Sequence, residues 1–256
     1  MNILTIGDVV GGIGCEFLRK VLPGLRKLKG IDLVIANGEN SADGNGITPK
    51  SAEYLFDSGV DVITTGNHTY RRREVYDYLD EHERVLRPAN FPSGAPGKGI
   101  CVVDMGRVQV AVLNIMGTVF LESLDCPFET LDRLLKQPDL PKIRILDFHA
   151  EATGEKRALG FYADGRITAL VGTHTHVPTA DEGILPKGTG YISDLGMTGV
   201  IDSALGVSPE IVIQKFKTKM PVRFENAEGV CKMDCLLISA DENTGLCTGV
   251  ERLSIK

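Results

Sequence analysis

Polar residues that can bind metal ions follow five apolar segments of this sequence. These residues are Asp, Glu, Asn and His, and they occur in Gly7-Asp8, Gly38-Glu39-Asn40, Gly66-Asn67-His68, Phe148-His149 and Thr173-His174-Thr175-His176. Each cluster ends a short apolar run, which is typical of a buried strand. In an open α/β sheet, ligands bind at the carboxyl ends of the strands. The sequence therefore predicts that the clusters meet at one edge and form a metal site.

The side-chain types favour first-row divalent ions. Carboxylate, carboxamide and imidazole groups suit such ions, and the absence of cysteine from every cluster argues against a thiolate zinc site. The candidate ligands are too many for one ion but suit two: Asp8, Glu39, Asn40, Asn67, His149, His174 and His176. We expect Glu39 to bridge the ions. Two neighbouring ions stabilise the attacking and leaving oxygens of a displacement at phosphorus, so this set indicates phosphoester hydrolysis.

Each candidate also has a structural interpretation. A single histidine at a strand end is more often a hydrogen-bonded structural residue, but four histidines at three strand ends favour a metal site. The glycine-rich turn from Gly7 to Gly14 joins a strand to a helix, as a dinucleotide-binding turn does. Its spacing is wrong for that motif, and Asp8 would face a pyrophosphate. We instead expect a tight turn beside the metals, with the next helix directing its amino terminus at a substrate phosphate.

Strands and helices must alternate to position these clusters. The first part of the chain predicts a parallel sheet with right-handed crossovers, and residues 100–115 predict a hairpin. We expect one domain, residues 1–256, in which a second sheet faces the first and helices lie outside. Predicted strands are 2–7, 32–36, 60–65, 100–105, 109–115, 142–148, 167–171, 190–194, 211–215, 222–226, 232–239 and 246–253. Predicted helices are 15–29, 51–58, 73–83 and 130–136.

The composition limits the possible settings. The 256 residues are 43% hydrophobic and 24% charged, which is ordinary for a globular protein. The net charge of −6 opposes stable binding to nucleic acid or to a membrane surface, but it permits a small nucleotide substrate. No apolar run is long enough for a membrane span, and we expect no secretory signal at the start of the chain. With six scattered cysteines, these features predict a reduced, cytoplasmic protein.

The order of the clusters resembles the calcineurin-like metallophosphoesterases, and specifically their YmdB-like branch. The resemblance covers nearly the whole chain and extends to Leu86–Asn90, Asp147–Thr153 and Asp194–Gly199. Two positions depart from the broad superfamily, in which most members have a histidine where Val10 stands and an aspartate where Glu39 stands. The YmdB-like branch shares both departures. One imidazole fewer makes the first metal site harder and favours iron or manganese over zinc.

The resemblance implies a four-layer α-β-β-α sandwich with two divalent or mixed-valence metal ions. One ion would bind Asp8, Glu39, Asn40 and His176, and the other would bind Glu39, Asn67, His149 and His174. It also implies hydrolysis of cyclic nucleotides, with 2′,3′-cyclic nucleotides giving 3′-nucleotides. A metal-bridging hydroxide would attack phosphorus, and His68 would act as the general acid. Members of the family self-associate, so the resemblance also implies a homo-oligomer.

Several alternatives stay open. His68 could be a hydrogen-bonding neighbour of the metals rather than an acid. Asn45, Thr48, Lys50 and Arg71 are candidate substrate contacts, although charges at a helix start usually face solvent. One rival function is a regulatory or RNA-associated metal-binding protein with the hydrolase fold, which the complete ligand set disfavours. The other is a metal-dependent amidohydrolase, which is disfavoured because no extra glutamate base lies near the histidines.

Overall fold

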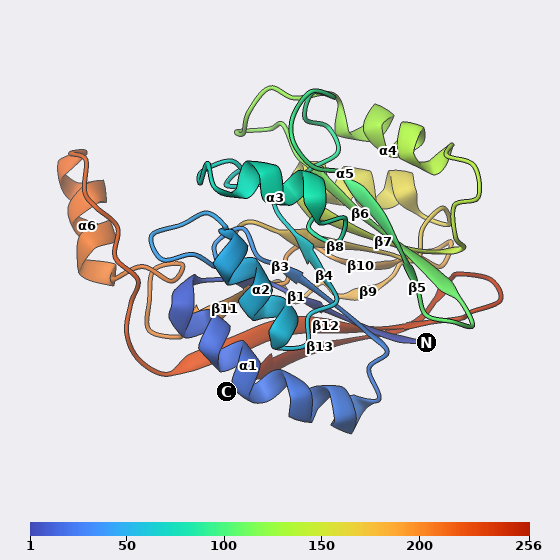
Figure 1. Ribbon diagram of the computed structural model, residues 1–256, viewed down its shortest axis with the longest axis horizontal. Coiled ribbons are helices and arrows are strands. Elements are labelled where there is room, and N and C mark those ends of the chain that lie inside the picture. Colours follow the sequence, from blue (N-terminus) through green and yellow to red (C-terminus); the bar gives the residue numbers. More distant parts are fainter.

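The computed structural model describes residues 1–256, which form two β-sheets and six α-helices (Figure 1). The first sheet contains β1 (Asn2–Ile6), β2 (Asp8–Val9), β3 (Leu33–Asn37), β4 (Val62–Thr64), β11 (Met197–Val200), β12 (Cys231–Ala240) and β13 (Cys247–Ile255). The second contains β5 (Ile100–Asp104), β6 (Gln109–Met116), β7 (Ile143–His149), β8 (Ala169–Thr173), β9 (Gly183–Ile184) and β10 (Gly190–Ile192). The helices are α1 (Gly11–Lys29), α2 (Pro49–Asp57), α3 (Val75–Glu81), α4 (Pro127–Leu135), α5 (Thr153–Ala163) and α6 (Pro209–Thr218). The predicted mixed α/β class is confirmed.

The strands that precede the polar clusters are mostly parallel to their neighbours. In the first sheet, whose order is β2-β11-β12-β1-β3-β4, β1 pairs in parallel with β3, and β3 with β4. In the second sheet, whose order is β5-β6-β7-β8-β10-β9, strands β6, β7, β8 and β10 pair in parallel. His149 at the end of β7 is in register with Thr173 at the end of β8. Parallel pairing therefore brings the clusters of each sheet to one edge.

Three large apolar cores hold the helices and sheets together. Successive side chains of a strand point to opposite faces, so Leu4 packs against the first-sheet helices while Ile3 packs toward the second sheet. The core around Ile3 also contains Val112 of β6, and the two sheets therefore face one another. A third core joins the other face of the second sheet to α4 and α5, for example through Leu159.

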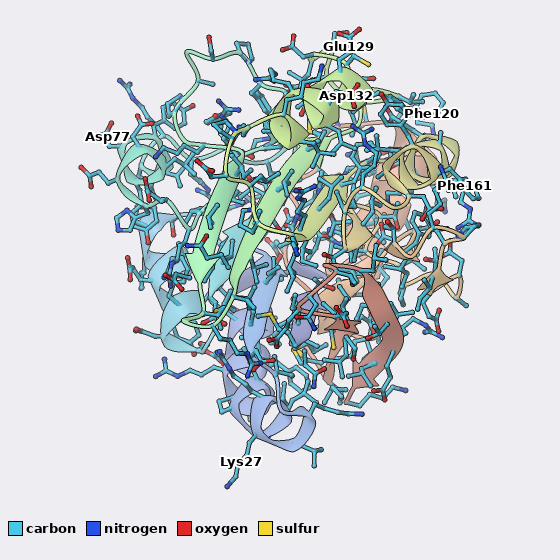
Figure 2. All side chains as sticks on the ribbon, turned by 90° about the vertical axis from the view of Figure 1, so that its right-hand side faces the viewer. Lys27, Asp77, Phe120, Glu129, Asp132 and Phe161 are labelled. Carbon is cyan, nitrogen blue, oxygen red and sulfur yellow. The ribbon has the colours of Figure 1, made fainter.

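The helices turn their polar faces outward. Lys27 on α1, Asp77 on α3 and Glu129 on α4 lie at the periphery of the molecule (Figure 2). In α1 the buried residues include Leu18 and Leu22, one turn apart, which form the stripe that faces the first sheet. None of the helices combines the length and the apolar character needed to cross a membrane.

Some predicted elements were wrong. Residues 211–215 lie in helix α6 rather than in a strand, and residues 222–226 form no strand. The β-branched residues near Ile211 favour a strand, but Ser208, Pro209 and Glu210 supply the start signals of a helix. Helix α5 was not predicted, because Gly154 and Gly160 weaken its helical pattern.

Two glycines of α1 allow a test of how this helix packs. A Cβ atom on Gly24 would have nothing within 4 Å, and its backbone is helical. We expect Gly24→Ala to raise the free energy of unfolding by about 0.5–1 kcal/mol, because alanine loses less backbone entropy on folding. Urea denaturation measures this change. The control is Gly14→Ala. The new Cβ atom would lie 2.5 Å from the carbonyl oxygen of Thr198, so this substitution should destabilise the protein.

Candidate metal centre

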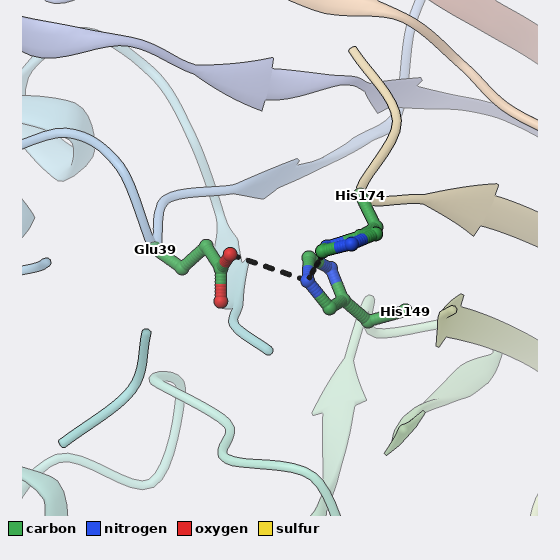
Figure 3. A group of neighbouring side chains, drawn as sticks. All are labelled: Glu39, His149 and His174. Carbon is green, nitrogen blue, oxygen red and sulfur yellow. Dashed lines mark hydrogen bonds and ion pairs between the residues drawn. The ribbon is translucent and has the colours of Figure 1, made fainter. Parts of the chain in front are cut away.

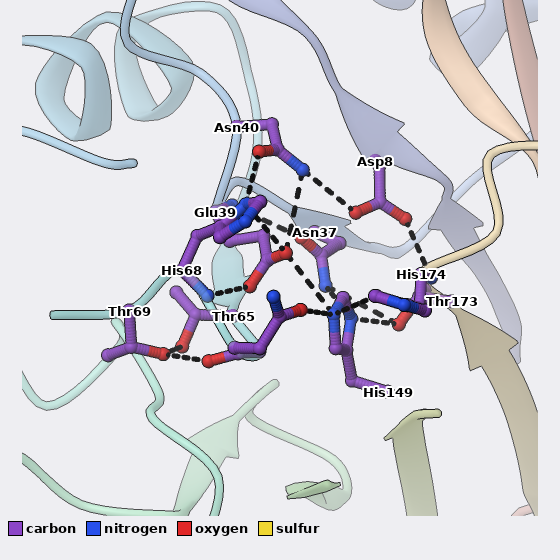
Figure 4. Close-up of polar contacts among 12 residues, drawn as sticks. Asp8, Asn37, Glu39, Asn40, Thr65, His68, Thr69, His149, Thr173 and His174 are labelled. Atoms are coloured by element: carbon purple, nitrogen blue, oxygen red, sulfur yellow. Dashed lines mark hydrogen bonds and ion pairs between the residues drawn. The ribbon is translucent and has the colours of Figure 1, made fainter. Parts of the chain in front are cut away.

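The structure brings the predicted ligands and His68 together where the carboxyl edges of the two sheets meet. Figure 4 shows Asp8, Glu39, Asn40, His68, His149 and His174 of this group. Three of the groups form a tight cluster (Figure 3), in which one ligand atom each from Glu39, His149 and His174 lies within 4.8 Å of the others. His149 is at its centre. Its Nε2 atom lies 3.2 Å from Glu39 Oε1, 2.9 Å from Asn67 Oδ1 and 3.1 Å from His174 Nδ1.

His149, His174 and His176 each have one ring nitrogen that faces the cluster, the inner nitrogen, and one that faces away from it, the outer nitrogen. Each outer nitrogen has a hydrogen-bond acceptor beside it. These acceptors are the Thr173 hydroxyl for His149 (2.9 Å), the Glu151 carboxylate for His174 (3.0 Å) and the Leu205 carbonyl for His176 (3.0 Å). An outer acceptor fixes the tautomer, because it keeps the proton of a neutral imidazole on the outer nitrogen. The inner nitrogens then direct their lone pairs at one another and at the carboxylates.

This arrangement fits a metal ion. The inner lone pair of His149 faces a carboxylate oxygen, a carboxamide oxygen and the inner nitrogen of His174, and none of these atoms carries a proton to donate when the imidazoles are neutral. A divalent cation is the species that all four atoms can bind at once. Glu39, Asn67, His149 and His174 are therefore suited to hold one ion.

A second group of potential ligands adjoins the first. Asp8 Oδ1 lies 3.5 Å from His176 Nε2, and Asn40 Nδ2 lies 3.4 Å from Asp8 Oδ1, 3.3 Å from His176 Nε2 and 3.5 Å from Glu39 Oε1. The Asn40 nitrogen thus faces the three acceptors, while its oxygen accepts a hydrogen bond from His68 Nδ1 at 2.7 Å. The carboxamide has to turn over if Asn40 is to offer its oxygen to an ion held by Asp8 and His176.

The buried charges are consistent with a cationic centre. Asp8 and Glu39 are 0% and 1% exposed, and their only ion-pair partners are histidines. Burial alone would raise the pKa of Glu39, but His149 and His68 hold that pKa below its ordinary value. Burial lowers the pKa of His149, yet Glu39 and Asp8 outweigh it and raise the pKa to about 9. The carboxylates thus attract positive charge into a site that lacks lysine and arginine.

Close packing also positions His149. A Cβ atom on Gly66 would lie 2.1 Å from His149 Cδ2, so only glycine leaves room for the ring. Beneath the ring, the Thr173 hydroxyl donates to Asp147 Oδ1 at 2.7 Å. Asp147 also accepts hydrogen bonds from Thr64 and from Asn37, and burial raises its pKa to about 6.

Sequence reasoning missed this network below His149. A signal was nevertheless present, because Asp147 lies two residues before His149 on one strand and therefore shares its face of the sheet. Thr173 immediately precedes His174 and ends the neighbouring strand in register with His149. Glu151, which contacts His174, was also missed, because only the tertiary structure brings its loop near β8.

His68 lies beside the candidate ligands and keeps one nitrogen available. Its Nδ1 atom contacts Asn40 Oδ1, its backbone N–H donates to Glu39 Oε2 at 2.9 Å, and Nε2 has no partner in the protein. The side chain is 25% exposed. Burial lowers the pKa of His68, and the nearby charges of Arg71 and His149 lower it further, although Glu39 opposes them. His68 can therefore meet a substrate through Nε2.

Of the four predicted substrate contacts, only Arg71 has a connection to His68. Arg71 is exposed and close enough to affect His68 electrostatically. Thr48 instead caps α2, because its hydroxyl accepts a hydrogen bond from the Ser51 N–H at 3.1 Å. Lys50 and Thr48 line a surface pocket of about 470 Å³ that includes none of the candidate metal ligands. Asn45 is exposed, with a left-handed backbone (φ 87°).

The expected phosphate site at the start of α1 is occupied by the chain itself. The Gly11 N–H donates to the Asn40 carbonyl at 2.8 Å, and the Gly12 N–H donates to Asp43 Oδ1 at 3.0 Å. Asp43 therefore takes the place that the sequence predicts for a substrate phosphate, since both are anions that suit a helix amino terminus.

Comparison with known proteins gives consistent matches along the whole chain. A family model described as "YmdB-like protein" matches residues 4–253. The chain is 48% identical to the 2′,3′-cyclic-nucleotide 2′-phosphodiesterase of Bacillus subtilis (strain 168), over 100% of this chain and 97% of that protein. A hypothetical protein from Thermus thermophilus is 40% identical, with a TM-score of 0.94 over 99% of this chain and 98% of that chain. A "novel phosphatase" from Mycoplasma pneumoniae is 33% identical, with a TM-score of 0.94 over 100% and 93% of the respective chains.

Removal of the Thr173 hydroxyl tests whether the contacts behind His149 affect metal binding. We expect Thr173→Val to lower Mn²⁺ affinity about 10–100-fold, because the ring loses the acceptor that fixes its tautomer. Competition with a fluorescent chelator measures the affinity. Thr168→Val is the matched control, since Thr168 is also buried but bonds Arg144 and Gly245 before the start of the same strand. Equal affinities for both variants would contradict the role of Thr173.

Proposed function

Because the chain belongs to the YmdB-like protein family, we propose that it is a metal-dependent phosphodiesterase. Its proposed substrates are cyclic nucleotides, with 2′,3′-cyclic nucleotides opened to 3′-nucleotides. The observation that carries the proposal is the convergence of histidine lone pairs on Glu39 and Asn67 in a buried cluster without lysine or arginine. The activity named for the Bacillus subtilis relative supports the choice of substrate.

We assign the ligands to two ions that share Glu39. Asp8, Asn40 and His176 would complete one site, and Asn67, His149 and His174 the other. Iron or manganese suits the first site better than zinc, because it has one imidazole with carboxylate and carboxamide oxygens. When bound, the ions supply an activated water nucleophile and positive charge for the phosphoryl oxygens.

The protein's own residues then orient the diester and handle the proton. His68 is the proposed general acid, with Nε2 open toward the substrate. Once Asn40 turns its oxygen toward an ion, Glu39 Oε1, 3.4 Å from Nδ1, is the acceptor left for Nδ1–H. Protonation at Nε2 lets His68 donate that proton to the departing ribose 2′ oxygen. The negative phosphate offsets the effects that lower the His68 pKa. Arg71 is the favoured phosphate contact, and roles for Asn45, Thr48 and Lys50 require movement or a larger substrate.

The same proposal extends to the organisation of the protein. The three successive cores support a four-layer α-β-β-α sandwich built as one domain over residues 1–256. All six cysteines are free, which supports a reducing compartment such as the cytoplasm.

The active-site proposal is tested by His68→Ala. We expect this variant to keep its metal content but to lose about 10²–10⁴-fold in turnover of a ribose cyclic diester, because the alkoxide leaves without a proton. The loss should be smaller with a 4-nitrophenyl diester, whose leaving group needs no acid. Chromatography of products and elemental analysis measure both properties. His82→Ala is the control, since His82 stacks on Tyr78 outside the centre.

Three outcomes would revise this proposal. Full activity of His68→Ala on the ribose diester would remove His68 from the role of acid. Retained metal in Asn67→Ala at wild-type affinity would remove Asn67 from the ligands. A metal-loaded wild-type protein that cleaves no phosphodiester in a panel of 2′,3′- and 3′,5′-cyclic nucleotides would favour the regulatory or RNA-associated alternative.

We also propose that the chain forms a homo-oligomer through α6. This helix stands apart from the body of the molecule and contains no buried residue (Figure 1). Ile213, Phe216 and Met220 on and beside it are 56%, 66% and 63% exposed. Burial of such side chains in a subunit contact removes apolar surface from water. Phe216→Ser should therefore lower the molar mass measured by light scattering, whereas the same substitution at Phe161, which is 50% exposed on α5, should leave it unchanged.

A further inference from the structure

A buried ion pair lies behind the loop that carries two of the candidate ligands. Lys156 of α5 and Asp194 are 2% and 1% exposed, and Lys156 Nζ lies 2.6 Å from Asp194 Oδ2. Neither side chain contacts a candidate metal-binding side chain, and the proposed reaction does not use them. Burial of two charges costs free energy that their attraction repays only with good geometry and further hydrogen bonds. The pair therefore needs a reason that the proposed chemistry does not give.

The remaining contacts of Asp194 lead to the histidine loop. Its Oδ2 atom also accepts the Thr175 N–H at 3.0 Å, and its Oδ1 atom accepts the Gly196 N–H at 2.9 Å. The backbone of Asp194 is fixed in turn by Thr179, through two hydrogen bonds of 2.9 and 3.0 Å. The carboxylate is thus rigidly placed, with one oxygen shared between the Lys156 ammonium and the amide that separates His174 from His176.

The loop needs such support because its backbone is strained. His174 and His176 have φ angles of 102° and 62°, in the left-handed region that residues with a Cβ atom rarely occupy. Two successive amides are held by buried carboxylates, since the His174 N–H donates to Asp8 Oδ2 at 3.1 Å (Figure 4) and the Thr175 N–H donates to Asp194. Strained residues of this kind persist only where their surroundings determine the conformation.

The Lys156 side chain is also packed closely against the end of β8, at Gly172. A Cβ atom on Gly172 would lie 1.8 Å from the Ser193 carbonyl oxygen and 3.2 Å from Lys156 Cδ. The Leu195 N–H donates to the Gly172 carbonyl at 2.8 Å, so the strand end before the loop and the segment after Asp194 are joined. Lys156 therefore fills the space directly behind the strand that leads into His174.

We propose that Lys156 and Asp194 form a positioning pair that holds the His174-Thr175-His176 loop in its metal-binding conformation. Lys156 compensates the Asp194 charge, and Asp194 fixes the Thr175 amide so that both imidazoles direct their inner nitrogens at the centre. The pair acts on both metal sites at once, because His174 belongs to one proposed ligand set and His176 to the other. This inference rests on the proposed metal centre.

The test is Mn²⁺ affinity, measured by chelator competition, together with thermal stability. Lys156→Met keeps most of the length of the side chain but removes the ammonium, which leaves Asp194 buried without a counterion, so the loop loses its fixed support. We expect Mn²⁺ affinity to fall about 10–100-fold, as for other residues that orient metal ligands. Arg26→Met is the control, because Arg26 pairs with Asp61 at 3.0 Å near the starts of β3 and β4 and should lose stability without losing Mn²⁺ affinity.

Two results would overturn the positioning role. One is Lys156→Met with wild-type Mn²⁺ affinity and a stability loss like that of Arg26→Met. If Lys156→Met does not fold, the second variant is Thr179→Val, which removes the hydroxyl that accepts the Asp194 N–H. Unchanged Mn²⁺ affinity in Thr179→Val then rejects the positioning role. A wild-type protein that binds no Mn²⁺, iron or zinc would instead reject the metal centre itself.

Discussion

Buried electron-rich groups without a balancing lysine or arginine are the constraint on which this structure depends. Asp8 and Glu39 are almost completely removed from water, and their only ion-pair partners are histidines. In the absence of a metal ion, protons on the imidazoles must balance these charges, which explains why the pKa of His149 rises to about 9 despite its burial. A divalent cation would replace those protons and bind the same lone pairs, so the binding of metal and the release of protons are coupled.

The fold keeps these groups together by fixing them from behind. Parallel strands deliver the side chains to one edge, and each imidazole is anchored at its outer nitrogen. The anchors differ in kind: a hydroxyl backed by Asp147, a partly exposed carboxylate and a backbone carbonyl. The strained loop of His174 and His176 adds a further requirement, since its backbone amides need buried acceptors of their own.

The loop that follows Asn40 serves the framework more than sequence reasoning expected. Asp43 caps α1, and Arg72 donates from the segment after His68 to the carbonyls of Asp43 (2.6 Å) and Asn45 (3.0 Å). Thr48 caps α2. These bonds connect the loop that begins at Asn40 to the loop that carries His68, and Asn40 itself contacts His68. The loop thus helps to set the distance between a proposed ligand and the proposed acid.

The sequence by itself determined the alternation of strands and helices, the hairpin of β5 and β6, and the clusters that meet at the sheet edges. Those features depend on local hydrophobic period and on residue type, which are visible within a short window. The tertiary structure alone decided that Asp43 occupies the start of α1 and that Glu151, Lys156 and Asp194 support the histidines. Those roles depend on contacts between segments far apart in the chain, and no local pattern records which distant carboxylate will reach a given amide or imidazole.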